Sequence, residues 1–345
     1  MVLEWAGDGA AHSTREPSRR TRASPATLIG MTRHRLLLAL SVSVLVAACG
    51  GGAATPSSPA ASASASAGAV PSDAGTQASV IPVIVSSRQV PGPNRFVFSF
   101  LDPKTNLPAA SPDRKASVAF IPPGETQPGT ATQAEFVWAI EGSRGDYVAN
   151  VELGAPGDWK AVFITEAPGS PQEAIGVGFQ VSESSPTISV GSPAPATDNP
   201  TVASAGSVDR VSTDPHPDPS FYAQTVKEAL AAKEPFVLVF ATPAFCQSAQ
   251  CGPTLDRIKA VAAASPANVR FINVEPYQLT FTEGRLQPVL DANNQLQPVE
   301  AVNTWGILTE PWVFTVDASG VVRGSFEGVV GEDELKAAVA EIAKS

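Results

Sequence analysis

The sequence predicts a two-domain protein, in which an all-β sandwich is followed by an α/β domain. Residues 79–182 hold seven short runs rich in Val, Ile, Phe and Trp, bounded by Pro, Gly, Asn and Asp, a pattern typical of antiparallel strands. Residues 215–345 instead alternate helical and strand-like segments, which indicates an α/β layer fold. Residues 183–214 are rich in Ser, Pro, Ala, Thr and Gly, and we interpret them as a linker.

Side-chain alternation places one face of the sandwich strands in a core. Phe96, Phe98 and Phe100 alternate with other residues, so one face is buried and the other faces water. Seven strands in about 100 residues favour a sandwich of immunoglobulin type. Residues 145–149 and 156–162 resemble bacterial extracytoplasmic immunoglobulin-like modules, in which a tyrosine strand, a turn and a tryptophan strand recur. No cluster of ionisable groups stands out, so a spacer or docking role is expected. The predicted strands are 80–86, 95–101, 116–121, 134–140, 146–153, 159–165 and 175–181.

The second domain is predicted around a buried central strand. Residues 236–240 form a continuous apolar run, which is typical of a strand covered on both faces. Apolar residues at helical spacing predict helices that pack on this strand. We expect helices over 221–232, 253–264 and 332–343, and further strands over 269–274, 312–316 and 322–328.

The N-terminal region is predicted to be an export signal with a lipid-attachment site. Basic residues at 33–35 precede an apolar run over 36–48, which is too short for the roughly 20 residues of a membrane-spanning helix and fits a signal peptide. The following Val-Ala-Ala-Cys resembles the bacterial lipobox, which implies that Cys49 carries the lipid. Residues 1–48 are then an upstream extension and signal peptide, with Met31 as an alternative start. Residues 49–78 are a flexible tether, and the protein is expected on the extracytoplasmic face of the cell membrane.

Composition argues against two classes of partner. The chain has 23 Lys and Arg against 33 Asp and Glu, a net charge of -10, whereas nucleic-acid binding requires clustered positive charge. It has three cysteines and three histidines, too scattered for a structural zinc site. We therefore expect no nucleic-acid partner, no metal and no cofactor.

Two segments of the C-terminal domain carry a family resemblance. Residues 240–253, FATPAFCQSAQCGP, resemble the strand, aromatic-cysteine loop and helix start of the thioredoxin superfamily, and residues 305–314, WGILTEPWVF, resemble its cis-proline segment. The resemblance covers about residues 215–345 and implies a thioredoxin-like fold. It implies that Cys246 and Cys251 are the redox pair and that Pro311 is the cis-proline. The implied substrate contacts are Phe245, Thr309, Glu310 and Trp312.

The position of the cysteines has a chemical consequence that does not depend on the family. A thiol at a helix start faces free backbone N–H groups and the positive end of the helix dipole, which lower its pKa. A second thiol can then attack the mixed disulfide and release the partner. Cys246 and Cys251 are separated by four residues, where the family usually has two. A five-residue step turns about 140° beyond a full turn of a regular helix, so Cys246 must precede the helix or the first turn must be distorted.

The identity of the nucleophile remains open between two alternatives. Cys246 follows an aromatic residue, as the nucleophile of the family does, whereas Cys251 begins a Cys-Gly-Pro string in which Thr254 replaces the second cysteine. We favour Cys246 as nucleophile. The buried acid that many thioredoxins carry before the loop is absent, because Val239 and Phe240 occupy that neighbourhood.

Three functions compete on these observations. The favoured one is a lipid-anchored thiol-disulfide oxidoreductase that acts on exported proteins with thiols or disulfides. The alternative is a non-catalytic binding or scaffold lipoprotein with a structural disulfide. Copper handling, which pairs two cysteines with a later histidine, is less favoured, since no histidine follows Cys251 and His216 lies upstream.

Overall fold

The computed structural model describes residues 78–345. The predicted signal peptide, Cys49 and all but the last residue of the predicted tether lie outside the described residues. The described part is mostly β-sheet, with four sheets and a few short helices, and it belongs to one compact unit.

Residues up to Val181 form two antiparallel four-stranded sheets that share one core. One sheet has the order β1-β2-β6-β5 and the other β4-β3-β7-β8. Phe98 and Tyr147 of the first sheet meet Phe163 of the second, and the Phe98 and Phe163 ring centroids are 4.8 Å apart. All seven strands predicted here are confirmed; only the two-residue β4 is additional. The strands are β1 Ile81–Ile84, β2 Gly92–Leu101, β3 Lys115–Ile121, β4 Thr132–Gln133, β5 Glu135–Ile140, β6 Arg144–Leu153, β7 Gly157–Glu166 and β8 Glu173–Val181.

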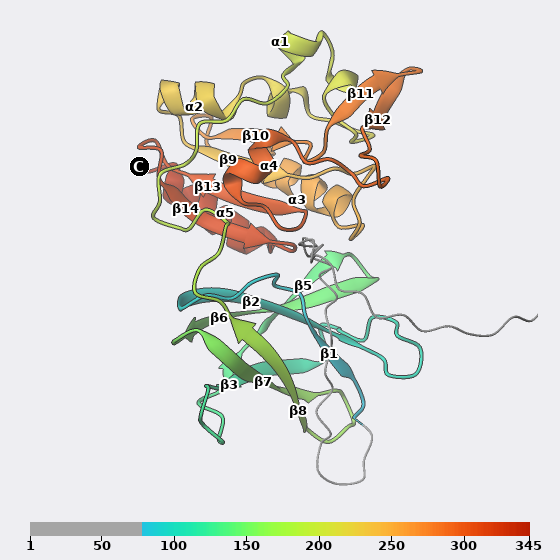
Figure 1. Cartoon of the computed structure of the whole chain (residues 1–345), viewed down its shortest axis with the longest axis vertical. Coiled ribbons are helices and arrows are strands. Elements are labelled where there is room, and N and C mark those ends of the chain that lie inside the picture. The colour runs from blue at the N-terminus through green and yellow to red at the C-terminus, as the bar shows by residue number, and fades with distance from the viewer. Residues whose placement is uncertain (1–77) are drawn as a thin grey trace, which may run out of the picture. The chain divides into compact units, whose positions relative to one another are not determined.

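The C-terminal region is built on a mixed sheet of order β10-β9-β13-β14 (Figure 1). Strand β9 runs parallel to β10 and antiparallel to β13, and β14 pairs antiparallel with β13. Every residue of β9 is buried, as the apolar run predicted. The strands are β9 Phe236–Phe240, β10 Arg270–Val274, β13 Trp312–Val316 and β14 Val322–Glu327.

Helices cover both faces of this sheet. Val237 and Val239 of β9 pack towards α3 (Cys251–Ala263) and α5 (Glu332–Ile342). Phe236, Leu238 and Phe240 pack on the other face, towards α2 (Val226–Ala232) and α4 (Glu300–Trp305). This two-sided burial removes β9 from water and fixes both ends of the strand, including the end that leads into the cysteine loop.

Some elements differ from the sequence prediction. The helix predicted over 221–232 is wrong in its first part, which is a 3-10 turn over Pro219–Tyr222. Helix α2 begins only after Thr225, whose side chain accepts from the Glu228 N–H while Glu228 bonds back to the Thr225 N–H, and such a capping box sets a helix start. The short α4 and the hairpin of β11 (Leu279–Thr282) and β12 (Arg285–Pro288) were not predicted.

Residues 183–214 pack along the C-terminal region. The Thr187 hydroxyl donates to the Gly306 carbonyl at 2.7 Å, and Ile188 N–H donates to the Trp305 carbonyl at 3.1 Å. Gly306 has φ +66°, and an added Cβ would overlap the Pro186 carbonyl, so only glycine fits this close approach. Two short helices, α1 (Val202–Ala205) and a 3-10 turn over Val208–Arg210, follow in the same segment.

Candidate functional site

A disulfide joins Cys246 and Cys251 beside the sheet, with Cα atoms 6.0 Å apart. Cys251 is the first residue of α3, whereas Cys246 lies in the loop between β9 and α3. The sequence argument left two alternatives, a Cys246 that precedes the helix or a distorted first turn, and in the structure Cys246 precedes the helix. The helix begins two residues earlier than predicted, at Cys251 and not at Pro253.

The two sulfurs differ in their surroundings. Cys251 is 0% exposed and belongs to the core under α3 and α5, while Cys246 is half-buried at the edge of that core. The backbone N–H of Cys251, at the start of α3, donates to Cys246 Sγ at 3.2 Å. The Ser248 hydroxyl lies 3.3 Å from the same sulfur. Only Cys246 is therefore open to an incoming group, and it is the sulfur that faces hydrogen-bond donors.

The segment before β13 lies against the cysteine loop. The Glu310–Pro311 peptide bond is cis. Glu310 Oε1 accepts from the Gln247 N–H at 3.1 Å, and the Glu310 carbonyl accepts from the Ser248 hydroxyl at 3.2 Å. The structure thus brings Glu310 and Pro311, which is 65 positions from Cys246 in the sequence, to the loop that holds Cys246.

The four residues proposed as substrate contacts have different environments. Phe245 is half-buried and Thr309 is exposed, although the Thr309 hydroxyl donates to Glu327 at 2.8 Å. Glu310 is half-buried and bonds to Gln247 and Ser248 of the cysteine loop. Trp312 is only 7% exposed and packs in the core under α2 and α4, which leaves a small part of its side chain accessible. Leu308, 43% exposed, was not singled out by the sequence, although it is an apolar residue next to the proline segment.

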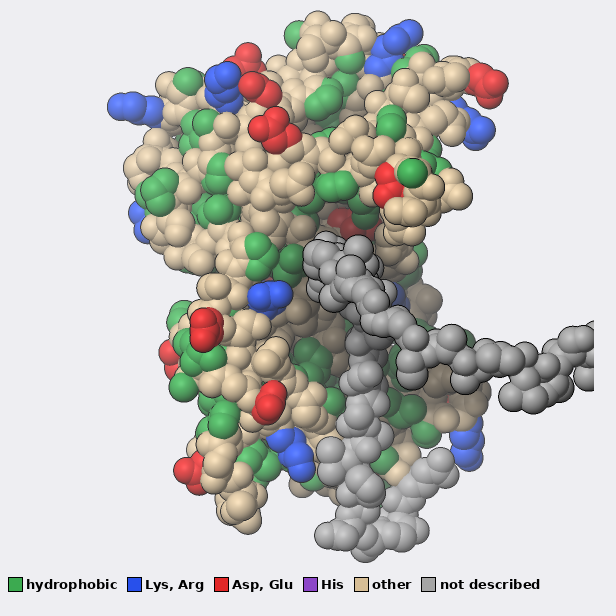
Figure 2. Space-filling view, viewed as in Figure 1, with side chains coloured by type: hydrophobic (Ala, Val, Ile, Leu, Met, Phe, Trp, Pro, Cys, Tyr) green, Lys and Arg blue, Asp and Glu red, His purple; other side chains and the backbone are tan. Residues whose placement is uncertain are grey.

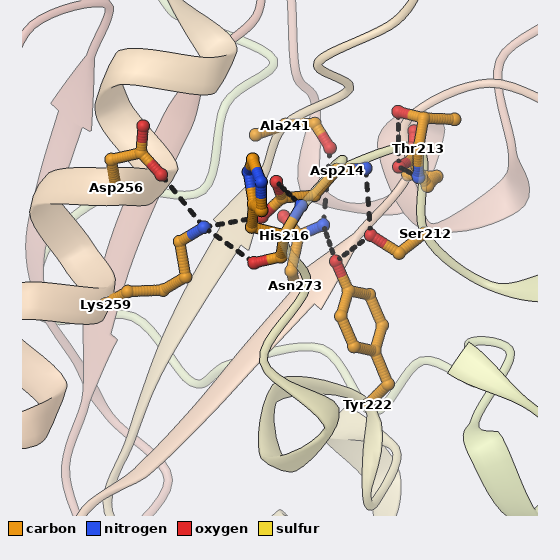
Figure 3. Close-up of polar contacts among 10 residues, drawn as sticks. Ser212, Thr213, Asp214, His216, Tyr222, Ala241, Asp256, Lys259 and Asn273 are labelled. Atoms are coloured by element: carbon orange, nitrogen blue, oxygen red, sulfur yellow. Dashed lines mark hydrogen bonds and ion pairs between the residues drawn. The ribbon is translucent and has the colours of Figure 1, made fainter. Parts of the chain in front are cut away.

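A network of polar contacts joins residues 212–216 to Tyr222, Lys259 and Asn273, and its Tyr222 and Asn273 side chains are buried (Figure 3). Tyr222 hydroxyl contacts the Ser212 hydroxyl at 2.7 Å and accepts from Asn273 Nδ2 at 3.0 Å. Lys259 of α3 donates to Asp214 at 2.8 Å and to the His216 carbonyl at 3.0 Å. Through Asn273 and Lys259, these contacts attach residues 212–216 to β10 and to α3.

Glu275, at the end of β10, connects the network to the cysteine loop. Its Oε1 accepts from the backbone N–H and the hydroxyl of Thr213, at 2.6 and 2.8 Å, while its Oε2 is buried without a partner. The Thr213 hydroxyl in turn accepts from the Ala244 N–H at 3.2 Å, two residues before Cys246. Burial raises the pKa of the Glu275 carboxyl to about 7, and the neighbouring Asp214 adds to the rise.

Metal ligands do not gather in the described part of the chain. Among residues 78–345, no group of three or more His, Cys, Asp or Glu side chains is placed to hold a metal ion. His216 lies beside Lys259 in the polar network, where its backbone N–H donates to Asp214 at 2.9 Å.

On the face shown in Figure 2, Lys and Arg side chains lie apart from one another and are mixed with Asp and Glu. Within the described residues, no helix has the length and apolar character needed to cross a membrane.

No protein-family model matches the chain, and no curated protein is significantly similar to it.

Proposed function

We propose that this protein is a lipid-anchored thiol-disulfide oxidoreductase of exported proteins, with a thioredoxin-like catalytic domain. The observation that carries the proposal is the asymmetry of the cysteine pair. Cys246 is reachable and its sulfur accepts an N–H at the start of α3, whereas Cys251 is fully covered. A sulfur in that position is favoured as thiolate, and the thiolate is the nucleophile in disulfide exchange.

The arrangement of elements supports the thioredoxin-like domain. Helix α3 connects the parallel strands β9 and β10, the antiparallel β13 and β14 complete the sheet, and α5 closes the chain. The disulfide precedes α3 and the cis peptide bond precedes β13, which are the places that the family resemblance implies. For residues 79–182 we propose an immunoglobulin-like module that spaces or docks the catalytic domain, supported by its two antiparallel sheets around one core.

The different burial of Cys246 and Cys251 assigns each cysteine a step in thiol-disulfide exchange. The Cys246 thiolate attacks a substrate disulfide, the substrate S–S bond breaks, and one substrate thiolate leaves. The Cys251 thiol then loses its proton and attacks Cys246 Sγ, which forms the internal disulfide and releases the second substrate thiolate. Two electrons pass to the substrate, and the same steps in reverse oxidise a substrate dithiol. Within this scheme Cys246 is the entering nucleophile and Cys251 the resolving thiol.

A redox titration of the full-length chain tests the proposal. A Cys49→Ala background leaves only the pair as thiols. We expect a reduction potential between about −270 and −120 mV, the range of catalytic pairs, and faster alkylation of Cys246 than of Cys251 near neutral pH. A potential below about −300 mV, or a bond that resists reduction until the protein unfolds, would instead identify a binding lipoprotein with a structural disulfide.

A further inference from the structure

The Ser248 hydroxyl lies between two acceptors of the candidate site. Its Oγ is 3.3 Å from Cys246 Sγ and 3.2 Å from the Glu310 carbonyl oxygen. A hydroxyl has a single hydrogen, so it can donate to only one of them at a time. A disulfide sulfur is a weak acceptor, and the hydrogen therefore goes to the Glu310 carbonyl when the Cys246–Cys251 bond is formed.

We propose that Ser248 is a catalytic residue whose hydroxyl changes its acceptor with the redox state of the pair. In the reduced protein it donates to the Cys246 thiolate, and in the disulfide form it donates to the Glu310 carbonyl. This inference rests on the proposed function. Hydrogen bonds to an ionised acceptor are about twice as strong as those to a neutral one, so a thiolate outcompetes the carbonyl. Both acceptors are already within 3.3 Å, and a rotation of the Ser248 side chain suffices.

The Ser248 hydroxyl changes its acceptor when the Cys246–Cys251 disulfide is reduced. A thiolate of a reducing dithiol attacks Cys246, the internal disulfide breaks, and Cys251 leaves as a thiolate that takes up a proton. The second thiol of the reductant, once deprotonated, attacks the mixed disulfide and releases Cys246 as a thiolate. Two electrons come from the dithiol, which ends as a disulfide. The new Cys246 thiolate then has two donors, the Cys251 N–H and the Ser248 hydroxyl.

The same rotation frees a backbone acceptor for the substrate. The Glu310 carbonyl precedes Pro311 and the start of β13, beside the reachable Cys246. An extended polypeptide segment binds through backbone hydrogen bonds to such groups. In the disulfide form the Ser248 hydroxyl occupies one of the two lone pairs of this carbonyl oxygen and stands beside the other, and in the reduced form it leaves the carbonyl. Ser248 therefore favours binding of an extended substrate to the reduced protein.

The first experiment measures the pKa of Cys246 in the reduced full-length chain with Cys49→Ala, from the pH dependence of its alkylation by iodoacetamide. Loss of a hydrogen bond to the thiolate in Ser248→Ala should raise this pKa by about one unit. Ser248→Thr keeps a hydroxyl and should restore it. Ser265→Ala, which removes a hydroxyl at the far end of α3, should leave it unchanged. An unchanged pKa in Ser248→Ala, in a protein whose wild type exchanges reversibly, overturns this inference alone; a wild type that does not exchange overturns the proposed function.

The second experiment measures how much the Glu310 carbonyl contributes to binding of a substrate backbone. The disulfide form is reduced by an extended cysteine-containing peptide and, separately, by dithiothreitol, which has no peptide backbone. The altered thiol pKa affects both reactions, so the ratio of the two rate constants reports on backbone binding. In Ser248→Ala the Glu310 carbonyl is free from the outset, and the ratio should rise about fivefold, as expected for one neutral hydrogen bond. A ratio equal to that of the wild type and of Ser265→Ala contradicts the change of acceptor.

Discussion

The Tyr277 hydroxyl donates a hydrogen bond of 2.9 Å to Glu310 Oε2. Burial and the adjacent Glu310 carboxylate raise the pKa of Tyr277, so the phenol remains a donor over the physiological range. The other carboxylate oxygen of Glu310 accepts from the Gln247 N–H at 3.1 Å. The Glu310 carboxylate thus joins the segment that follows β10 to the cysteine loop, where it contacts Gln247, the residue next to Cys246 in the sequence.

Removal of this charge should make Cys246 more acidic. A nearby carboxylate disfavours a thiolate, so Glu310→Gln should lower the Cys246 pKa by about half a unit to one unit, while the amide oxygen still accepts from Gln247. The pH dependence of alkylation in the reduced protein measures the change. Glu341→Gln on the exposed side of α5 is the matched control and should have no effect. A higher or unchanged Cys246 pKa in Glu310→Gln contradicts the prediction.

The buried carboxyl of Glu275 should make stability depend on pH. Its pKa is about 7 in the folded protein against an ordinary value of 4.5, so between these values the folded state holds a proton that the unfolded state has lost. The resulting stabilisation is full below pH 4.5 and is lost as the pH rises through about 7. The unfolding free energy of the wild type should therefore fall by about 2 kcal/mol more than that of Glu275→Gln between about pH 5 and about pH 8. Urea titrations of both proteins measure this difference, and parallel pH profiles would rule out the assignment.

The segment over 183–214 should behave as a packed part of the protein. Thr187→Val removes the buried hydrogen bond to the Gly306 carbonyl, and we expect a loss of about 1–2 kcal/mol of unfolding free energy. Thr304→Val, at an exposed position of α4, should cost much less. In the native full-length chain, limited proteolysis should spare the residues around Thr187, and rapid cleavage there would show that this contact does not hold the segment in solution.

The predicted lipid site has a direct test in a bacterial host that processes lipoproteins. Cys49→Ala should move the protein from the membrane fraction to the released fraction, because a thiol is required for lipid attachment. Cys246→Ala, which leaves the signal region intact, should remain with the membrane. Retention of Cys49→Ala in the membrane fraction would disprove the anchor.

Local sequence determined most of the strands and two of the helices. The alternating phenylalanines of β2 and the uninterrupted apolar run of β9 are set by short-range patterns, since side-chain burial repeats within a few residues. The five-residue step between the cysteines excluded a regular helix through both, because such a helix cannot bring both side chains to one face, but it left a distorted first turn as an alternative to Cys246 in the loop. Short elements such as α4 and the β11–β12 hairpin have too few residues to show a period.

Only the tertiary structure decided which side chains of the candidate site are buried and which of them contact one another. Which cysteine is covered depends on the core under α3 and α5, and the inward direction of Trp312 depends on the pairing of β13. The contacts of Ser248 and Glu310 join residues 62 positions apart, and the burial of Glu275 depends on Thr213, again 62 positions away. A single sequence carries no local signal for such pairs, because they form only when distant segments fold against the same sheet.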